Sequence, residues 1–201
     1  MRRGISSQIY LDTFADIALW AHEYFIATGT PGIGEVLWLM KHLRMEIFRL
    51  GSLQFELSSA SPAVLPPQAD GFTVLNVHIP KGADLSPAAV SSSYQAALQF
   101  WQLDCAVIMC HSWLLSPALP QLLPPSSRIL SFSRQFSFLE ADENDRQAEE
   151  RIFGGIKANP QQYQENTSLQ NAAKAYLLTG KSIPLGAGWQ LVKRQTARGK
   201  V

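Results

Sequence analysis

The sequence has little cysteine. Its 201 residues include only Cys105 and Cys110, which lie five positions apart in one predicted strand. Side chains at that spacing point to opposite faces of a strand, so the two thiols cannot bridge each other. A disulfide framework within the chain is therefore excluded, and we expect both cysteines to be reduced thiols that act as small core residues.

Charge is also scarce. Asp, Glu, Lys and Arg make up 16% of the chain, compared with roughly 25% in an average globular protein. The net charge is only +1, which gives no electrostatic basis for a nucleic-acid-binding surface. Two explanations of the low charge stay open: a domain with much buried sheet, or a surface covered by another domain or subunit.

No segment has the pattern of a membrane span or a signal peptide. Residues 105–127 carry no formal charge, but they include four prolines and His111, which a bilayer helix would not tolerate so close together. The first residues are not followed by an uninterrupted apolar stretch. We therefore expect no membrane partner and a cytoplasmic location.

The most informative pattern is a strand, a helix and a second strand within residues 71–115. Residues 72–79 alternate between two faces, as in a strand. Ser86 followed by Pro87 is typical of a helix start. Residues 105–112 are nearly all apolar and predict a strand buried on both faces.

A histidine stands near the end of each of these two strands, at His78 and His111. Parallel strands joined by a helix cross over right-handed, which brings both strand ends to the same edge of the sheet. Ligands bind at that edge in α/β folds. We therefore expect the functional site there, with the two strands as parallel neighbours that diverge at their carboxyl ends.

The flanking segments predict a mixed α/β fold. Thr13 with Asp16 matches a capping box at the start of an N-terminal helix, and Thr167 with Gln170 matches a second box. The other predicted elements are a helix at residues 35–42, strands at 47–57 around Gly51, a short helix after Ser116, a strand at 128–139, a helix at 144–153 and a last strand at 186–192.

Four motifs in this order resemble one bacterial family. They are residues 49–56 (RLGSLQFE), 77–82 (VHIPKG), 110–115 (CHSWLL) and 167–170 (TSLQ). The resemblance is to GNAT-like acyltransferases that have a helical N-terminal domain and a GNAT-like C-terminal domain. Family members are longer at the N-terminus, so residues 1–45 are expected to be a remnant of the helical domain and residues 46–201 the GNAT-like domain. A missing domain or a homo-oligomer would then cover the apolar face of the first helix.

The resemblance implies a GNAT-like α/β fold, with a central mixed sheet and splayed parallel strands preceded by short N-terminal helices. It implies acetyl-CoA or another acyl-CoA as co-substrate, and a small-molecule amine or a peptide as acceptor. Backbone N–H groups near Val77 and Ile79 would face the acyl carbonyl. Lys81, Gly82 and the helix start at Ser86 would hold a phosphate group.

Residues 80–87 contain one glycine instead of the glycine-rich pyrophosphate loop that is usual in GNAT enzymes. Two functions therefore stay open. The first is an acyl-CoA-dependent N-acyltransferase, and the alternative is a catalytically inactive GNAT-like module that binds a ligand or a protein.

His111, Ser112 and His78 are the candidate catalytic residues. His111 is predicted to carry the proton chemistry as a general base, because the pKa of imidazole lies near neutrality; the alternative is a structural histidine at a strand end. The same alternatives hold for His78, where the structural role is favoured. Ser112 could donate a proton to the departing thiolate, as the resemblance implies. A nucleophilic Cys110 is disfavoured because an apolar strand raises the pKa of a thiol, and the histidine and cysteine spacings match no common zinc site.

Overall fold

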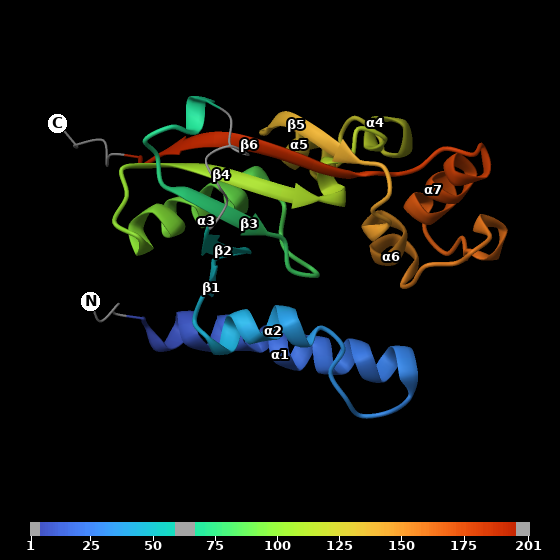
Figure 1. The fold of residues 1–201 in the computed structure, drawn as a ribbon, viewed down its shortest axis with the longest axis horizontal. Helices are drawn as coiled ribbons and strands as arrows, with labels where there is room; N and C mark the ends of the chain where they lie inside the picture. Colours follow the sequence, from blue (N-terminus) through green and yellow to red (C-terminus); the bar gives the residue numbers. More distant parts are fainter. Residues whose placement is uncertain (1–4, 59–66, 196–201) are drawn as a thin grey trace. The chain divides into compact units, whose positions relative to one another are not determined.

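The strands and helices follow the order expected of a mixed α/β fold (Figure 1). The computed structural model describes residues 5–58 and 67–195. Its strands are β1 (Ile47–Leu50), β2 (Leu53–Leu57), β3 (Val74–His78), β4 (Cys105–Ser112), β5 (Ser137–Asp142) and β6 (Leu185–Lys193). Its helices are α1 (Ser7–Thr28), α2 (Val36–Leu43), α3 (Pro87–Phe100), α4 (Leu119–Leu122), α5 (Arg128–Ser133), α6 (Gln147–Phe153) and α7 (Ser168–Leu178), with single turns η2 (Pro67–Ala69), η3 (Trp113–Leu115) and η4 (Pro160–Gln162).

The strands form a six-stranded sheet in the order β1-β2-β3-β4-β6-β5. Strands β1, β2 and β3 pair antiparallel, and so do β5 and β6. The chain divides into two units. The first contains residues up to 84, residues 88–107 and the end of β6, and the second contains residues 85–87 and 108–191. The predicted mixed α/β class is confirmed, whereas the domain boundary at residue 45 stays a prediction.

The predicted strand, helix and strand are present as β3, α3 and β4. Helix α3 begins at Pro87, directly after Ser86. Strands β3 and β4 are neighbours, and the Val107 N–H donates to the Thr73 carbonyl over 3.0 Å near the start of both strands. Their parallel direction stays a prediction, and so does the divergence of their carboxyl ends.

In the first unit, the antiparallel strands separate an apolar face from a polar one. Phe55 is paired with Phe48 on one side and Val77 on the other, and its ring lies 6.1 Å from that of Tyr94 in α3. The next residue on either side of Phe55 is polar, and these two residues share the opposite face with Asn76 and His78. Helix α3 thus covers the apolar face and leaves the polar face to other elements.

Helices α1 and α2 contact the polar side of this unit. Helix α1 begins at Ser7, because the Ser6 hydroxyl caps it, and it ends at Gly29 in a left-handed conformation. The predicted capping box at Thr13 and Asp16 is therefore wrong. Both residues lie inside the helix and are buried, and Thr13 Oγ1 accepts the Arg49 N–H of β1 over 2.9 Å. Residue types that favour helix starts serve here in tertiary contacts.

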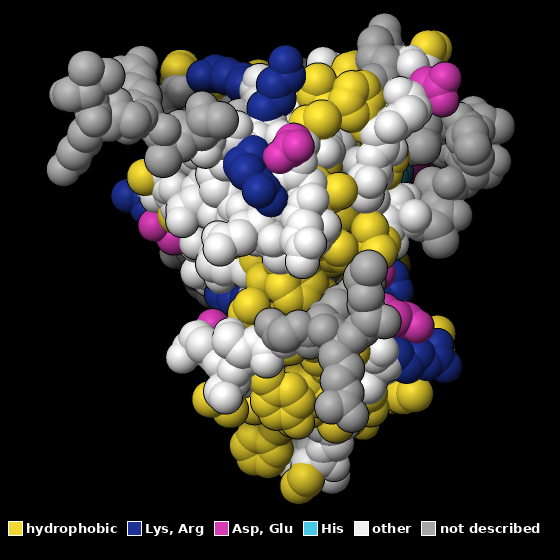
Figure 2. All heavy atoms as spheres, turned by 90° about the vertical axis from the view of Figure 1, so that its left-hand side faces the viewer, with side chains coloured by type: hydrophobic (Ala, Val, Ile, Leu, Met, Phe, Trp, Pro, Cys, Tyr) yellow, Lys and Arg dark blue, Asp and Glu magenta, His cyan; other side chains and the backbone are white. Residues whose placement is uncertain are grey.

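Large apolar side chains remain exposed on α1 and α2, where Figure 2 shows hydrophobic side chains gathered in its lower part. Leu11 and Phe25 of α1 are 62% and 48% exposed, and Leu37 of α2 is 87% exposed. The expected incomplete covering of α1 is thus present. None of the helices in the described part of the chain is both long and apolar enough to cross a membrane.

The second unit has its own apolar core between short helices. The core is built around Leu119, Ala148, Ala173, Leu177 and Ile183. The capping box that opens α7 is confirmed, because the Thr167 hydroxyl and the Gln170 side chain each accept the other residue's backbone N–H.

The prediction of a single strand at residues 128–139 is wrong in its first part. Its first part is α5, in which the Ser127 hydroxyl accepts the Ile129 N–H and so caps the first turn. Its second part is β5. Helix α5 has only six residues, which is too short for a helical period to be told from a strand-like alternation.

Candidate functional site

The polar face of the first unit carries a group of four interacting side chains, named here the Glu56 cluster. Lys41 comes from α2, Glu56 from β2, and Asn76 and His78 from β3. Both carboxylate oxygens of Glu56 accept from Lys41 Nζ over 2.8 Å, and Oε1 lies 3.1 Å from His78 Nε2. Asn76 Nδ2 donates to the same oxygen over 3.4 Å.

The register of the strands puts the cluster on one face. Glu56 stands opposite Asn76, and Gln54 stands opposite His78, so the side chains of these four strand residues project from the same side of the β2–β3 pair. Lys41 lies in the last turn of α2 and reaches this face from the helix. The cluster therefore depends on the strand register and on the packing of α2.

The Glu56 carboxylate is ionised across the physiological pH range. Its side chain is only 10% exposed, and burial by itself would raise its pKa. Hydrogen bonds from His78 and Lys41, together with the positive charges of Lys41 and of His78 when it is protonated, outweigh burial and lower the pKa of Glu56 to about 2. A buried carboxylate that is charged at physiological pH thus lies beside an imidazole.

This arrangement fixes the proton on one nitrogen of neutral His78. An ionised carboxylate only accepts hydrogen bonds, so Nε2 of His78 carries the proton that Glu56 accepts. The lone pair is then on Nδ1. The His78 side chain is 28% exposed, so solvent reaches the residue. A histidine held in one tautomer by a carboxylate is the arrangement that general bases use.

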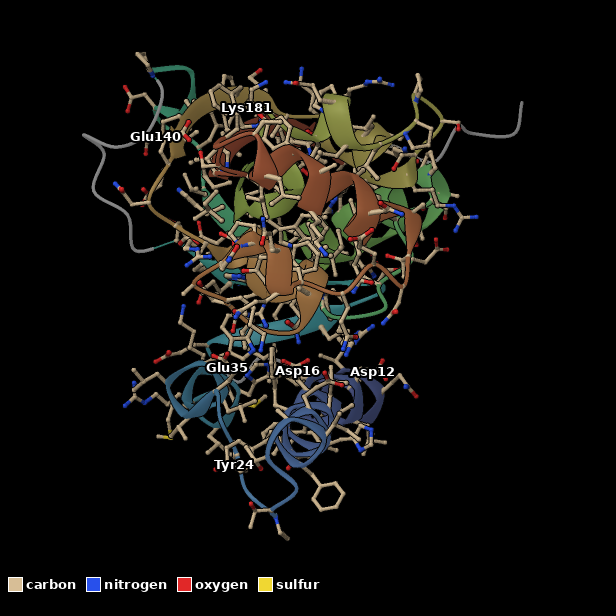
Figure 3. The ribbon with its side chains drawn as sticks, turned by 90° about the vertical axis from the view of Figure 1, so that its right-hand side faces the viewer. Asp12, Asp16, Tyr24, Glu35, Glu140 and Lys181 are labelled. Carbon is tan, nitrogen blue, oxygen red and sulfur yellow. The ribbon has the colours of Figure 1, made fainter. Side chains whose placement is uncertain are left out.

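A second polar group lies deeper in the same unit, between α1, α2 and β2. Asp16 and His42 are 3% and 0% exposed, and Asp16 Oδ2 lies 3.3 Å from His42 Nε2. The indole Nε1–H of Trp38 donates to Asp16 Oδ2 over 2.9 Å. Figure 3 labels Asp16 on the side of α1 that faces the strands. Gln54 Nε2 lies 3.3 Å from His42 Nε2 and extends the group to β2.

The predicted site residues divide between the two units. Val77, His78, Ile79, Lys81 and Gly82 belong to the first unit. Lys81 Nζ forms an ion pair with Glu23 of α1, with Nζ 2.5 Å from Oε2, and Gly82 adopts a left-handed conformation with φ 76°. Of these five residues, His78 alone is a member of the Glu56 cluster as the described contacts define it.

Ser86, His111 and Ser112 belong to the second unit. His111 is exposed near the end of β4. Ser112 is buried, and its hydroxyl accepts the Leu114 N–H and so caps η3. Ser86 immediately precedes α3. The chemical roles expected of these three residues stay predictions.

Sequence reasoning missed Glu56 and Lys41, which complete the arrangement around His78. A signal was present in the sequence, because polar residues stand at alternate positions of both strands, at Gln54 and Glu56 and at Asn76 and His78. This alternation indicates that one face of the strand pair is polar and the other is apolar. Cys110, by contrast, is fully buried, and burial raises the pKa of its thiol, which agrees with the low expectation for a nucleophile.

The second unit contains a different buried carboxylate. Glu149 accepts from both Arg146 Nε and Nη2 over 2.5 Å, and the Tyr163 hydroxyl donates to it over 2.6 Å. Burial alone would raise the pKa of Glu149, but the Arg146 and Tyr163 hydrogen bonds lower it. The Lys157 N–H donates to the Tyr163 hydroxyl over 2.9 Å, so this group ties α6 to the following loop.

Two family models match the chain. The model of the GNAT-like C-terminal domain matches residues 47–190, and the model of the N-acyltransferase N-terminal domain matches residues 1–45. A comparison with curated proteins gave no match.

The chain is also similar to solved acyltransferase structures. One is an acyltransferase in complex with CoA and 10C-teicoplanin, with a TM-score of 0.81, 25% identity, and coverage of 96% of this chain and 60% of that chain. A second, in complex with decanoyl-CoA and teicoplanin, gives the same values. A third, in complex with decanoyl-CoA, has a TM-score of 0.77 and 25% identity. The chain thus spans about 60% of the length of these acyltransferases.

Proposed function

Because the chain belongs to the family that has a GNAT-like C-terminal domain, we propose that it transfers an acyl group from an acyl-CoA to an amine. Similar structures are acyltransferases that contain CoA or decanoyl-CoA; one of them also contains 10C-teicoplanin and another teicoplanin. The observation that carries the proposal is the His78–Glu56 pair, which joins an oriented imidazole to a buried carboxylate.

His78 is the general base of the proposed reaction. The amine nitrogen attacks the carbonyl carbon of the thioester and loses a proton to Nδ1 of His78. Glu56 accepts from Nε2–H and stabilises the imidazolium that forms. The C–S bond then breaks and the CoA thiolate takes up a proton, for which Ser112 is the proposed donor. His78 and Ser112 then return to their starting states by proton exchange with water.

The acyl donor is proposed to bind beside β3. Backbone N–H groups near Val77 and Ile79 would donate to the acyl carbonyl as it becomes an oxyanion. Lys81, Gly82 and the amides that follow Ser86 would bind a phosphate group. Lys81 is largely exposed, and an exposed ion pair such as that with Glu23 is weak, so Lys81 can exchange Glu23 for a phosphate.

His111 is the second candidate base. Its exposed position at the end of β4 allows contact with a substrate. The described contacts favour His78, because a carboxylate that orients the ring and stabilises its charged form is seen at His78. The two histidines can be separated by substitution.

The test compares His78→Ala and His111→Ala in an assay that measures release of the free CoA thiol from acyl-CoAs of different chain length, with a panel of amines and peptides. Loss of a general base reduces kcat by roughly a hundredfold or more. We expect this loss for His78→Ala, with acyl-CoA affinity in calorimetry little changed.

His22→Ala is the matched control, because His22 is an exposed histidine of α1 outside the Glu56 cluster. Full activity of folded His78→Ala would overturn the role of His78, and a selective loss in His111→Ala would assign the base to His111. Binding of acyl-CoA by wild-type protein without turnover would support the alternative, an inactive ligand-binding module. No acyl-CoA binding would overturn the proposed function.

A further inference from the structure

We infer that Trp38 and Asp16 are positioning residues for His78, an inference that rests on the proposed function. Trp38 lies on α2 and contacts Asp16 of α1 and His78 of β3. Its indole Nε1–H donates to Asp16, and its ring lies edge-on to the His78 imidazole, with centroids 4.7 Å apart and an interplanar angle of 64°. One side chain thus links a buried carboxylate to the proposed base.

The Asp16 end of this link is fixed. Asp16 is 3% exposed, and the hydrogen bond from Trp38 is 2.9 Å long. Burial by itself would raise the pKa of Asp16, but hydrogen bonds from His42 and Trp38 outweigh it, so the pKa lies below its ordinary value and the carboxylate is charged. A charged acceptor makes a strong hydrogen bond, which restricts rotation of the indole.

The His78 end is held on two sides. Glu56 fixes His78 through Nε2, and the Trp38 ring restricts the tilt of the imidazole. Lys41, the other main partner of Glu56, lies 5.8 Å from the centroid of the Trp38 ring. Movement of the indole would therefore disturb the imidazole and a partner of its carboxylate together.

The link joins the regions matched by two family models. Asp16 and Trp38 lie within residues 1–45, matched by the N-acyltransferase N-terminal domain, whereas His78 lies within residues 47–190. The N-terminal helices thus do more than cover the strands: through Asp16 and Trp38 they hold the His78 ring. A displacement of a catalytic group by 1 Å can lower the reaction rate about a hundredfold.

The test uses Trp38→Phe, which keeps an aromatic ring beside His78 but removes the indole N–H, and Asp16→Asn, which removes the charge of the acceptor. Trp101→Phe is the matched control, because Trp101 lies in the same unit and its buried Nε1 has no hydrogen-bond partner among the described residues. The imidazole nitrogens of His78 are observed by 15N NMR in the ligand-free protein, whose four histidines permit assignment.

We expect a single Nε2-protonated form of His78 in wild-type protein and in Trp101→Phe, and a mixture of tautomers in Trp38→Phe and Asp16→Asn. The value of kcat should fall roughly tenfold in the latter two, with little change in KM for acyl-CoA. A folded Trp38→Phe protein with wild-type nitrogen shifts would overturn the inference, even if its stability is lower. If Asp16→Asn does not fold, Trp38→Phe decides, since it leaves α1 unchanged.

The readouts separate this inference from the proposed function. Wild-type protein that neither binds nor turns over acyl-CoA would refute the function, while the nitrogen spectra would still report whether Trp38 orients His78. Conversely, normal turnover in a Trp38→Phe protein with wild-type spectra would refute only the positioning role.

Discussion

Glu56 reaches His78 diagonally across two strands: Oε1 lies 3.1 Å from Nε2, although the register places Glu56 opposite Asn76. The pairing is therefore sensitive to register, because a shift by one residue would turn Glu56 to the other face. Phe55 and Val77 hold the register, since they are paired and buried on the apolar face. The apolar core on one side of the strands thus sets the geometry of the polar cluster on the other.

Replacing Glu56 by Gln should lower activity. The neutral amide keeps the shape of the side chain but no longer stabilises a protonated His78, and its N–H₂ can turn toward the ring and favour the other tautomer. We expect kcat to fall at least about tenfold while acyl-CoA affinity stays near that of the wild type. Steady-state kinetics and calorimetry measure the two quantities. Glu46→Gln removes an exposed carboxylate just before β1 and should leave both unchanged.

The lowered pKa of Glu56 makes a specific pH dependence of stability. The group has an ordinary pKa of 4.5 and a folded-state pKa of about 2. Its contribution to the free energy of unfolding is therefore complete above about pH 4.5 and is lost as the pH falls toward 2. Wild-type protein should lose more stability over this window than Glu56→Gln, measured by urea unfolding at several pH values. Parallel curves for the two proteins would contradict the assigned pKa.

Much of the fold could be predicted because its elements are long or clearly bounded. The strand, helix and strand from β3 to β4 have distinct periods, and Gly29 and the Thr167 capping box mark helix ends. The failures have local causes. Helix α5 is too short to show a period. Thr13 and Asp16 have the residue types of a helix start, but contacts from distant residues Arg49 and Trp38 use their side chains inside α1.

The candidate site could be predicted only in part. The position of His78 near the end of a recognisable strand makes it a candidate, although the sequence favours a structural role there and predicts the base at His111. The partners of His78 could not be predicted, because the contact of Glu56 with His78 depends on the register of β2 against β3, and that of Lys41 depends on how α2 packs. Local sequence patterns indicate neither of these two contacts. The motif at residues 49–56 contained Glu56 without indicating what its carboxylate contacts.

Tyr163→Phe should destabilise the second unit. The Tyr163 hydroxyl donates to buried Glu149 and accepts from the Lys157 N–H and from Arg146 Nη2, so its removal leaves three groups with fewer partners. We expect the free energy of unfolding to fall by about 1–3 kcal/mol in urea denaturation. Tyr176→Phe is the comparison in the same unit, because its described contact is a ring contact with Lys181, and it should cost less than Tyr163→Phe. An equal loss in the free energy of unfolding for both variants would show that the hydrogen bonds of the Tyr163 hydroxyl do not stabilise the unit.

Gly51→Ala should destabilise the first unit for two separable reasons. Gly51 turns the chain between β1 and β2 with φ 72°, a left-handed conformation that costs other residues about 1–2 kcal/mol. A Cβ there would also lie 2.7 Å from the Ser93 hydroxyl oxygen. That oxygen accepts the Ser52 N–H over 2.9 Å, so displacing Ser93 breaks a partly buried hydrogen bond.

Gly29→Ala isolates the backbone part of this cost, because Gly29 has φ 70° and nothing lies within 4 Å of its added Cβ. We expect Gly51→Ala to lower the free energy of unfolding more than Gly29→Ala does. In a Ser93→Ala background, which removes the clashing oxygen, the cost of Gly51→Ala should fall to that of Gly29→Ala. An unchanged cost in that background would place the strain in the backbone alone and contradict the contact with Ser93.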